Sequence, residues 1–208
     1  MKNLTVALIG GASGVGKTTL LDAVKLPQFS TGTFFKQKMS LASRDDVRKG
    51  DWSQYENEVA ADIALSICQV FDKNQSSIID THFAAKVNSK SYRIGLRRSL
   101  IFEMAKRWFE YGEELHKCVR ICIILIDCDP YSLMDRRRLD KGRDRELIPS
   151  DCINTLRQNR GFSSQYLTEV IRAHNKKQWE MSHKVGYFVV ENKDLNTARN
   201  QVINLFRP

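Results

Sequence analysis

The stretch LTVALIGGASGVGKTT, at residues 4–19, decides the fold of this chain of 208 residues. An apolar, strand-like segment leads directly into the pattern Gly-x-x-x-x-Gly-Lys-Thr at residues 11–18. The glycines at positions 11, 14 and 16 allow backbone N–H groups to turn inward around a polyphosphate, and Lys17 begins a helix whose positive dipole end faces the same anion. This is the spacing of a Walker A phosphate-binding loop, or P-loop, in which Thr18 supplies the hydroxyl that Mg²⁺ requires.

The residues on either side of the loop decide between this interpretation and an ordinary glycine turn. Residues 6–9 are apolar before the loop, and Leu20, Leu21 and Val24 follow it at helical spacing. We therefore favour a strand, a phosphate loop and a helix that together bind a nucleoside triphosphate.

The composition predicts a single domain at residues 1–208, large enough to bury a core without disulfides or a structural metal. No apolar run is long enough to cross a bilayer, so we expect no membrane partner. The five cysteines, at positions 68, 118, 122, 128 and 152, form no CxxC pair and no zinc-like spacing. Reduced thiols partly packed in a core are expected, in agreement with a cytoplasmic protein.

The formal net charge of +9 is the unusual feature of the composition. Basic residues concentrate at 93–98, 136–145 and 176–177. A basic chain attracts polyanions, and nucleotides, acidic partners and nucleic acid would all satisfy that attraction. Because no nucleic-acid-binding signature accompanies the charge, nucleic acid is the less favoured partner.

Apolar segments of strand length recur along the chain at residues 77–79, 121–126 and 187–190, with a short second strand before Thr31. Helices are predicted at residues 17–24, 34–41, 54–71, 99–111, 130–139, 150–176 with a break near Gly161, and 195–206. This alternation predicts an α/β fold with a doubly wound, mainly parallel five-stranded sheet and flanking helices. Ligands of such a sheet bind at the carboxyl ends of its strands.

Three polar clusters fall where such folds carry their chemistry: residues 31–34, residues 80–82, and the arginines at positions 136, 137, 138, 143 and 145. Asp80 ends an apolar strand, so its carboxylate would lie beside the phosphate loop and hold Mg²⁺ or one of its waters. Asp127 also ends a strand and is the competing candidate. We favour Asp80 because the polar Thr81 and His82 follow it.

His82 is a candidate general base, although a histidine at a strand end is at least as often a hydrogen-bonding loop residue. If the acceptor is itself a phosphate, it is already an anion and no base is required.

The arginine group is either a solvated basic face or a short lid near residues 136–148. We favour the lid, because arginine forks suit the oxygens of a transferring phosphoryl group and a loop can bring them to bound substrate. Arg44 and Arg48 lie four residues apart on one predicted helical face. They either clamp an acceptor phosphate or are solvated surface charges.

In this combination and order, the motifs resemble those of the archaeal-type adenylate kinases, which are small P-loop nucleoside monophosphate kinases. The likeness covers most of the chain. It rests on the loop at residues 11–19, Gly32-Thr33-Phe34, Arg44-Asp45-x-x-Arg48, Ile79-Asp80-Thr81-His82, Gly95-Leu96, the segment from Arg137-Arg138-Leu139 to Arg143-x-Arg145, and Gln158-Asn159-Arg160.

The resemblance implies transfer of a phosphoryl group from ATP to AMP, with Mg²⁺ as cofactor, giving two ADP. The family's members are often homo-oligomers. The implied ATP-binding residues are Gly11, Ala12, Ser13, Gly14, Val15, Gly16, Lys17, Thr18 and Thr19. The implied acceptor-binding residues are Thr33, Arg44, Arg48, Asp80, Thr81 and His82. The implied catalytic residues are Lys17, Arg138, Arg143 and Arg145, with Arg160 also closing over the phosphates, and the implied metal ligands are Thr18 and Asp80.

Two segments depart from the family. Residues 91–98, SYRIGLRR, replace a proline-containing Gly-Leu-Pro segment that should border the acceptor, and residues 103–117 are longer and more aromatic than a minimal kinase needs. Two other functions therefore stay open. One is a P-loop kinase acting on a hydroxyl of a small metabolite or nucleic-acid end, with Asp80 or His82 as base. The other is an ATP-sensing partner protein in which residues 93–111 form a protein interface.

Overall fold

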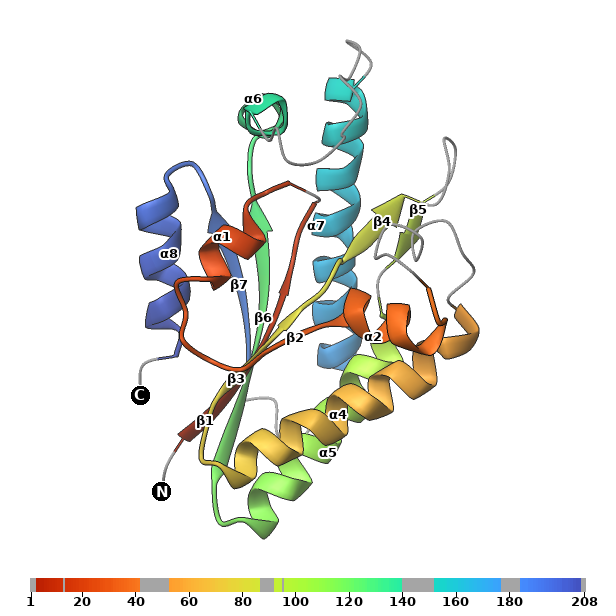
Figure 1. Ribbon diagram of the computed structural model, residues 1–208, viewed down its shortest axis with the longest axis vertical. Coiled ribbons are helices and arrows are strands. Elements are labelled where there is room, and N and C mark those ends of the chain that lie inside the picture. The colour runs from red at the N-terminus through yellow and green to blue at the C-terminus, as the bar shows by residue number, and fades with distance from the viewer. Residues whose placement is uncertain are drawn as a thin grey trace.

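The computed structural model describes residues 3–12, 14–41, 53–86, 92–94, 96–139, 152–176 and 184–206. At its centre lies a five-stranded sheet with the order β2-β3-β1-β6-β7, in which every neighbouring pair is parallel. The strands are β1 (Asn3–Gly10), β2 (Gln28–Ser30), β3 (Ser77–Asp80), β6 (Cys118–Asp127) and β7 (Val185–Glu191). The predicted five-stranded parallel sheet is confirmed (Figure 1).

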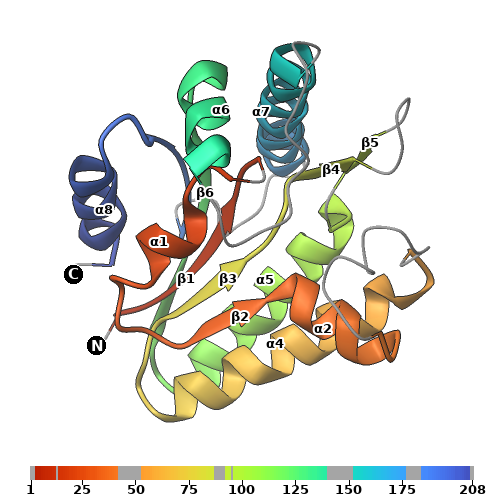
Figure 2. The same ribbon diagram turned by 45° about the horizontal axis from the view of Figure 1, so that its top comes forward.

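Helices cover both faces of this sheet, as the two ribbon views show (Figure 1, Figure 2). Along β1, Leu4, Val6 and Leu8 join one cluster of buried side chains, whereas Ala7 and Ile9 join a second. This alternation follows from the period of two of a strand. The helices are α1 (Lys17–Leu21), α2 (Thr31–Lys38), α4 (Glu56–Asp72), α5 (Arg98–Glu114), α6 (Pro130–Leu139), α7 (Cys152–Lys176) and α8 (Leu195–Asn204), with a 3₁₀ turn, η1 (Ser53–Tyr55), before α4.

The first cluster holds buried residues of α2, α4, α5 and α7, and the second holds those of α1, α6 and α8 together with Leu156 of α7. Strands buried on both faces read as continuous apolar runs, which is why the sequence pattern identifies them so readily. Since all five strands are parallel, their carboxyl ends lie at one edge, where the P-loop follows β1.

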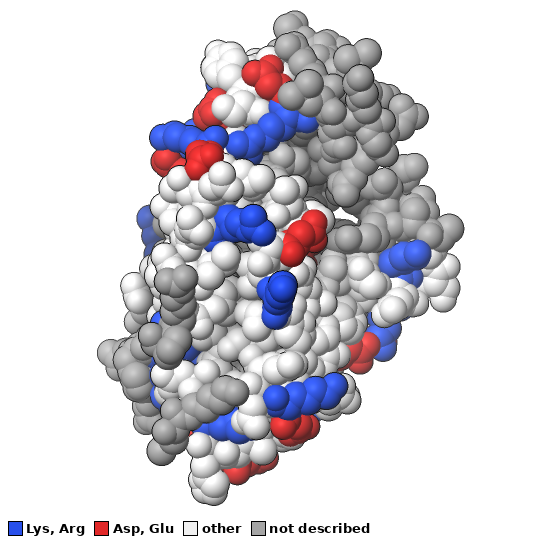
Figure 3. Space-filling view, turned by 60° about the vertical axis from the view of Figure 1, so that its left-hand side comes forward, with Lys and Arg blue, Asp and Glu red and all other residues white. Residues whose placement is uncertain are grey.

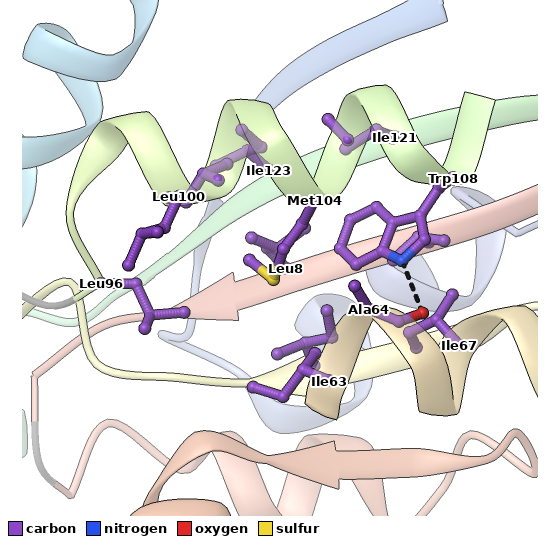
Figure 4. Close-up of a cluster of buried hydrophobic side chains, with 14 of the residues drawn as sticks. Leu8, Ile63, Ala64, Ile67, Leu96, Leu100, Met104, Trp108, Ile121 and Ile123 are labelled. Atoms are coloured by element: carbon purple, nitrogen blue, oxygen red, sulfur yellow. Dashed lines mark hydrogen bonds between the residues drawn. The ribbon is translucent and has the colours of Figure 1, made fainter. Parts of the chain in front are cut away.

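The aromatic residues of α5 belong to the core. Trp108 is fully buried, and its indole N–H donates to the carbonyl of Ala64 on α4 at 3.3 Å (Figure 4). Phe109 is also buried. The aromatic character of this segment is therefore explained by the core that covers the sheet, and these two rings are not available to a protein interface.

Two predicted boundaries are wrong. Helix α7 runs without a break through Gly161, which lies at a solvent-exposed position. The residues on either side of Gly161 are helical as well. Helix α2 begins at Thr31, three residues before the predicted start, so residues 31–34 form its first turn.

Residues 92–94 and 96–98, the described part of the segment that replaces the family's proline-containing one, pack against two helices. Strand β5 (Tyr92–Ile94) pairs antiparallel with β4 (Ala84–Lys86) beside α7. The carbonyl of Leu96 accepts a hydrogen bond of 2.6 Å from the buried Tyr166 hydroxyl of α7. Arg97 forms an ion pair of 2.5 Å with Glu56, at the start of α4. This segment is therefore fixed by tertiary contacts in place of a proline.

The cysteines whose side chains are described are free thiols. Three of them, Cys68, Cys122 and Cys128, are buried, and burial raises the pKa of each thiol. The expectation of reduced thiols packed in the core is confirmed for these three. Across the described residues, no helix combines the length and apolar character needed to span a membrane.

Candidate nucleotide-binding site

The P-loop joins β1 to α1 at the carboxyl edge of the sheet. Gly14 and Gly16 have φ angles of 88° and 89°, in the left-handed region that L side chains rarely adopt, and Gly16 caps the amino end of α1. The side chain of Lys17 is buried and donates to the carbonyls of Gly11, at 3.2 Å, and Ala12, at 3.5 Å. The ammonium group thus lies across the loop, within reach of anything that the loop encloses.

Thr18 and Thr19 are exposed on the first turn of α1, next to Lys17. The structure therefore brings together the described part of the predicted phosphate loop, residues 11–12 and 14–19. Ser13 lies outside the described residues.

The far side of the loop is held by two residues that no phosphate-loop motif includes. Asn192 donates from Nδ2 to the carbonyl of Val15 at 2.6 Å, and Arg136 donates from Nη1 to the same carbonyl at 3.4 Å. Arg136 also donates from Nη2 to the carbonyl of Asn192 at 2.6 Å. The sequence places Arg136 in a lid, but here its guanidinium group bonds the loop backbone. No sequence signal identifies Asn192 beyond its position as a polar residue directly after an apolar strand.

The second polar cluster lies at the end of β3, beside β1. Ile9 and Asp80 are register partners, and the amide of Thr81 donates to the carbonyl of Ile9 at 3.0 Å. The hydroxyl of Thr31, at the start of α2, lies 3.3 Å from the Thr81 hydroxyl and 3.4 Å from the Asp80 carbonyl. Both threonines are buried, whereas Asp80 is half-buried.

Thr31 thus contacts the residues at the end of β3, whereas Thr33, which the resemblance assigns to the acceptor, lies half-buried two residues further along α2. His82 is half-buried after Thr81. The role of Thr33 at the acceptor stays a prediction, and the sequence did not reveal that the Thr31 hydroxyl lies beside that of Thr81.

Asp127, the competing candidate for the metal, is bound by an arginine. The Arg160 guanidinium donates from Nε to both carboxylate oxygens, at 2.8 and 3.0 Å, and from Nη2 to Oδ2 at 2.7 Å. These hydrogen bonds raise the pKa of Arg160. When two N–H groups of one guanidinium bond to the same carboxylate, the ion pair is bidentate, which is its stronger form. Asp127 thus ties α7 to the carboxyl end of β6.

The side chains of the remaining arginines predicted at the acceptor site and in the lid are not among those that the structure describes. Arg44, Arg48, Arg143 and Arg145 lie outside the described residues, and of Arg138 only the backbone, within α6, is described. Their expected roles at the acceptor phosphate and in the lid therefore stay predictions.

Basic and acidic side chains are interspersed on the face that Figure 3 shows. Elsewhere the same pairing is seen between the exposed Lys193 and Glu191, which form an ion pair at 2.7 Å. Among the described residues of this face there is no single continuous basic patch of the kind that nucleic-acid binding requires.

Comparison with known proteins agrees with this geometry. A family profile described as "AAA domain" matches residues 10–157. An adenylate kinase of Thermoplasma acidophilum is 26% identical over 172 residues, which cover 77% of this chain and 81% of the relative. An adenylate kinase of Thermoplasma volcanium is 27% identical over 169 residues, covering 77% and 82%. The crystal structure of shikimate kinase from Bacteroides thetaiotaomicron superposes with a TM-score of 0.50 at 14% identity over 97% of both chains, a likeness of fold alone.

Proposed function

The chain belongs to the AAA domain family, and on this premise we propose that it is a P-loop kinase that transfers a phosphoryl group from ATP to a nucleoside monophosphate, first of all AMP. The kinase activity is supported by the P-loop on a parallel sheet and by two relatives named adenylate kinase. The choice of AMP is supported by those relatives and by the ordered motifs that resemble the archaeal-type enzymes.

The observation that carries the proposal is that the P-loop after β1 lies next to the polar residues after β3, at one edge of the sheet. The strand that leads into the P-loop bonds directly to the segment after β3, through the 3.0 Å hydrogen bond between Ile9 and Thr81. ATP held by the P-loop and a phosphoryl acceptor held near Thr31 and Thr81 would therefore lie in one crevice.

In the proposed reaction, a phosphate oxygen of AMP attacks the γ-phosphorus of ATP while the bond from that phosphorus to the β–γ bridging oxygen breaks. ADP leaves, and AMP becomes a second ADP. The acceptor oxygen is already anionic, so positioning and charge neutralisation supply most of the catalysis. Lys17 would leave the carbonyls of Gly11 and Ala12 for the transferring phosphoryl oxygens. We assign Arg138, Arg143 and Arg145 to the proposed lid, where they would also neutralise the negative charge of the transferring phosphoryl group.

The residues at this edge fit a magnesium ion. Mg²⁺ takes oxygen ligands and usually binds through one or two carboxylates together with phosphate oxygens and waters. The hydroxyl of the exposed Thr18, on the first turn of α1 after β1, and the half-buried carboxylate of Asp80, at the end of the neighbouring β3, are such groups. Asp127 fits less well because Arg160 occupies its carboxylate. When bound, the ion would neutralise charge on the β- and γ-phosphates.

Purified protein supplied with Mg·ATP and a panel of AMP, GMP, CMP, UMP and dAMP tests the acceptor. We expect AMP to give the highest kcat/KM, measured by chromatography of the nucleoside diphosphates. An oligonucleotide with a free 5′ hydroxyl is included as a second class of acceptor. Phosphorylation of the oligonucleotide and of no monophosphate would replace the proposed acceptor while keeping the kinase. Binding of Mg·ATP without transfer to any of these acceptors would overturn the proposed function.

A further inference from the structure

Asn192 and Arg136 both donate hydrogen bonds to the carbonyl of Val15, within the P-loop. We propose that these two are positioning residues for the phosphate loop and set the affinity for the triphosphate through the loop backbone. This inference rests on the proposed function only in taking Mg·ATP as the ligand of the loop.

The physical link is the peptide unit between Val15 and Gly16. A trans peptide is planar, so its carbonyl and its N–H point in opposite directions. The described residues contain no cis peptide bond. Two donors that hold the Val15 carbonyl therefore also fix the direction of the Gly16 N–H, one of the amides with which a P-loop cradles phosphate.

Asn192 is built into this position from three directions. Its amide N–H donates to the carbonyl of Asp127 at 2.7 Å, its own carbonyl accepts from Arg136, and its Nδ2 reaches Val15. The residue is completely buried. Because a carbonyl accepts and does not donate, Nδ2 must be the atom that faces Val15.

The rest of the carboxamide carries a cost. Asn192 Oδ1 is buried and lacks a hydrogen-bond partner within the described part of the chain. Buried polar atoms are ordinarily hydrogen-bonded, so an unsatisfied one calls for a reason. Here the reason is the hydrogen bond that Nδ2 of the same side chain donates to the P-loop, which must keep one conformation.

Gly16 is fitted to the same residue. A Cβ at Gly16 would stand 2.7 Å from Asn192 Nδ2, closer than real side chains approach. The glycine thus allows the carboxamide to lie directly behind the loop, in addition to adopting a positive φ. Arg136 links a third part of the chain to this arrangement, because from α6 it donates to the carbonyls of both Val15 and Asn192.

The test is a double-mutant cycle on Mg·ATP affinity, measured by isothermal titration calorimetry without any acceptor. Asn192→Leu removes the donor at similar size and adds no charge, and Arg136→Lys keeps the charge but loses the fork. We expect each variant to raise the Kd for Mg·ATP about tenfold, the equivalent of one hydrogen bond. The double variant should lose about as much as one single variant, because both side chains act on one carbonyl.

Asn200→Leu and Arg199→Lys, on exposed positions of α8, are the matched controls and should leave the Kd unchanged. In steady-state assays the KM for ATP should rise while the KM for the monophosphate stays the same, a split that general loss of structure would not give. If Asn192→Leu does not fold, the smaller Asn192→Ser replaces it. Unchanged ATP affinity in a folded variant, or losses that multiply in the double variant, would overturn the proposal. Absence of AMP phosphorylation would leave the binding result standing and overturn only the acceptor.

Discussion

The ring of Phe83 lies against the backbone of Gly10, where β1 runs into the P-loop. Phe83 is completely buried, and a Cβ added to Gly10 would overlap its ring. The centroid of the Phe83 ring also lies 5.1 Å from that of Tyr166, whose hydroxyl donates to the carbonyl of Leu96. One stack of side chains therefore joins the strand before the P-loop to the segment after β3 and to α7.

Gly10→Ala should destabilise the protein by about 1–3 kcal/mol, the usual cost of forcing extra volume into a packed core. Gly161→Ala is the matched control. Its added methyl group meets nothing within 4 Å at an exposed position in the middle of α7, so it should stabilise by about 0.5–1 kcal/mol. Urea denaturation measures both. Recovery of the loss by Phe83→Leu in the Gly10→Ala background would identify the ring as the cause, and equal effects of the two alanines would contradict the packing.

Lys17→Met should lower kcat about 100- to 1000-fold, the range seen when one donor to a transition-state charge is removed. The ammonium lies across the loop and has no substitute of equal charge on α1 among the described residues. Stopped initial-rate assays with AMP give the value, and Lys25→Met, on an exposed lysine after α1, is the control. A rate within threefold of the parent protein would exclude a catalytic role for Lys17.

Asp80→Asn and Asp127→Asn separate the two candidate metal carboxylates. Because Arg160 already binds Asp127, we expect Asp80→Asn to raise the Mg²⁺ concentration for half-maximal rate about 10- to 100-fold. Asp127→Asn should leave that concentration nearly unchanged. Titration of the rate with MgCl₂ at fixed ATP makes the comparison, and the reverse order of effects would assign the metal to Asp127.

The stability of the fold should fall at mildly acidic pH because of His174. This side chain is buried between the rings of Phe102 and Tyr187, at centroid distances of 6.3 and 5.6 Å, and burial lowers its pKa from 6.5. The unfolded chain then binds a proton at a pH where the folded chain does not. The free energy of unfolding should therefore decrease as pH falls below 6.5, by at most about 1.4 kcal/mol per pH unit for this one proton.

Urea midpoints between pH 7.5 and 5 for the parent protein and for His174→Leu provide the measurement. The variant should lose the part of the slope that lies below pH 6.5. His116→Asn, at an exposed turn position, should keep it. Parallel curves for the parent protein and His174→Leu would rule out this histidine as the cause.

Sequence reasoning succeeds where the relevant physics is local. The glycine spacing of the P-loop, the lysine that follows it and the apolar strands each lie within a few residues of one another, so the loop and the five-stranded sheet are predicted correctly. It fails at Gly161, where a single glycine cannot overcome the helical preference of 24 neighbours packed along α7. It also does not place Trp108 and Phe109 in the core, because composition does not reveal which surface a helix covers.

By itself, the sequence determined that a phosphate loop follows the first strand of a parallel sheet and that polar residues follow the third. Only the tertiary structure decided how these groups are held. Asn192 and Arg136 lie 177 and 121 residues from Val15 along the chain, yet both bond to its carbonyl. Such contacts have no local signal, since they depend on the strand order that brings β7 and α6 beside the loop. The residues proposed to bind phosphate are therefore readable as a motif, whereas those that hold the loop backbone emerge only from the fold.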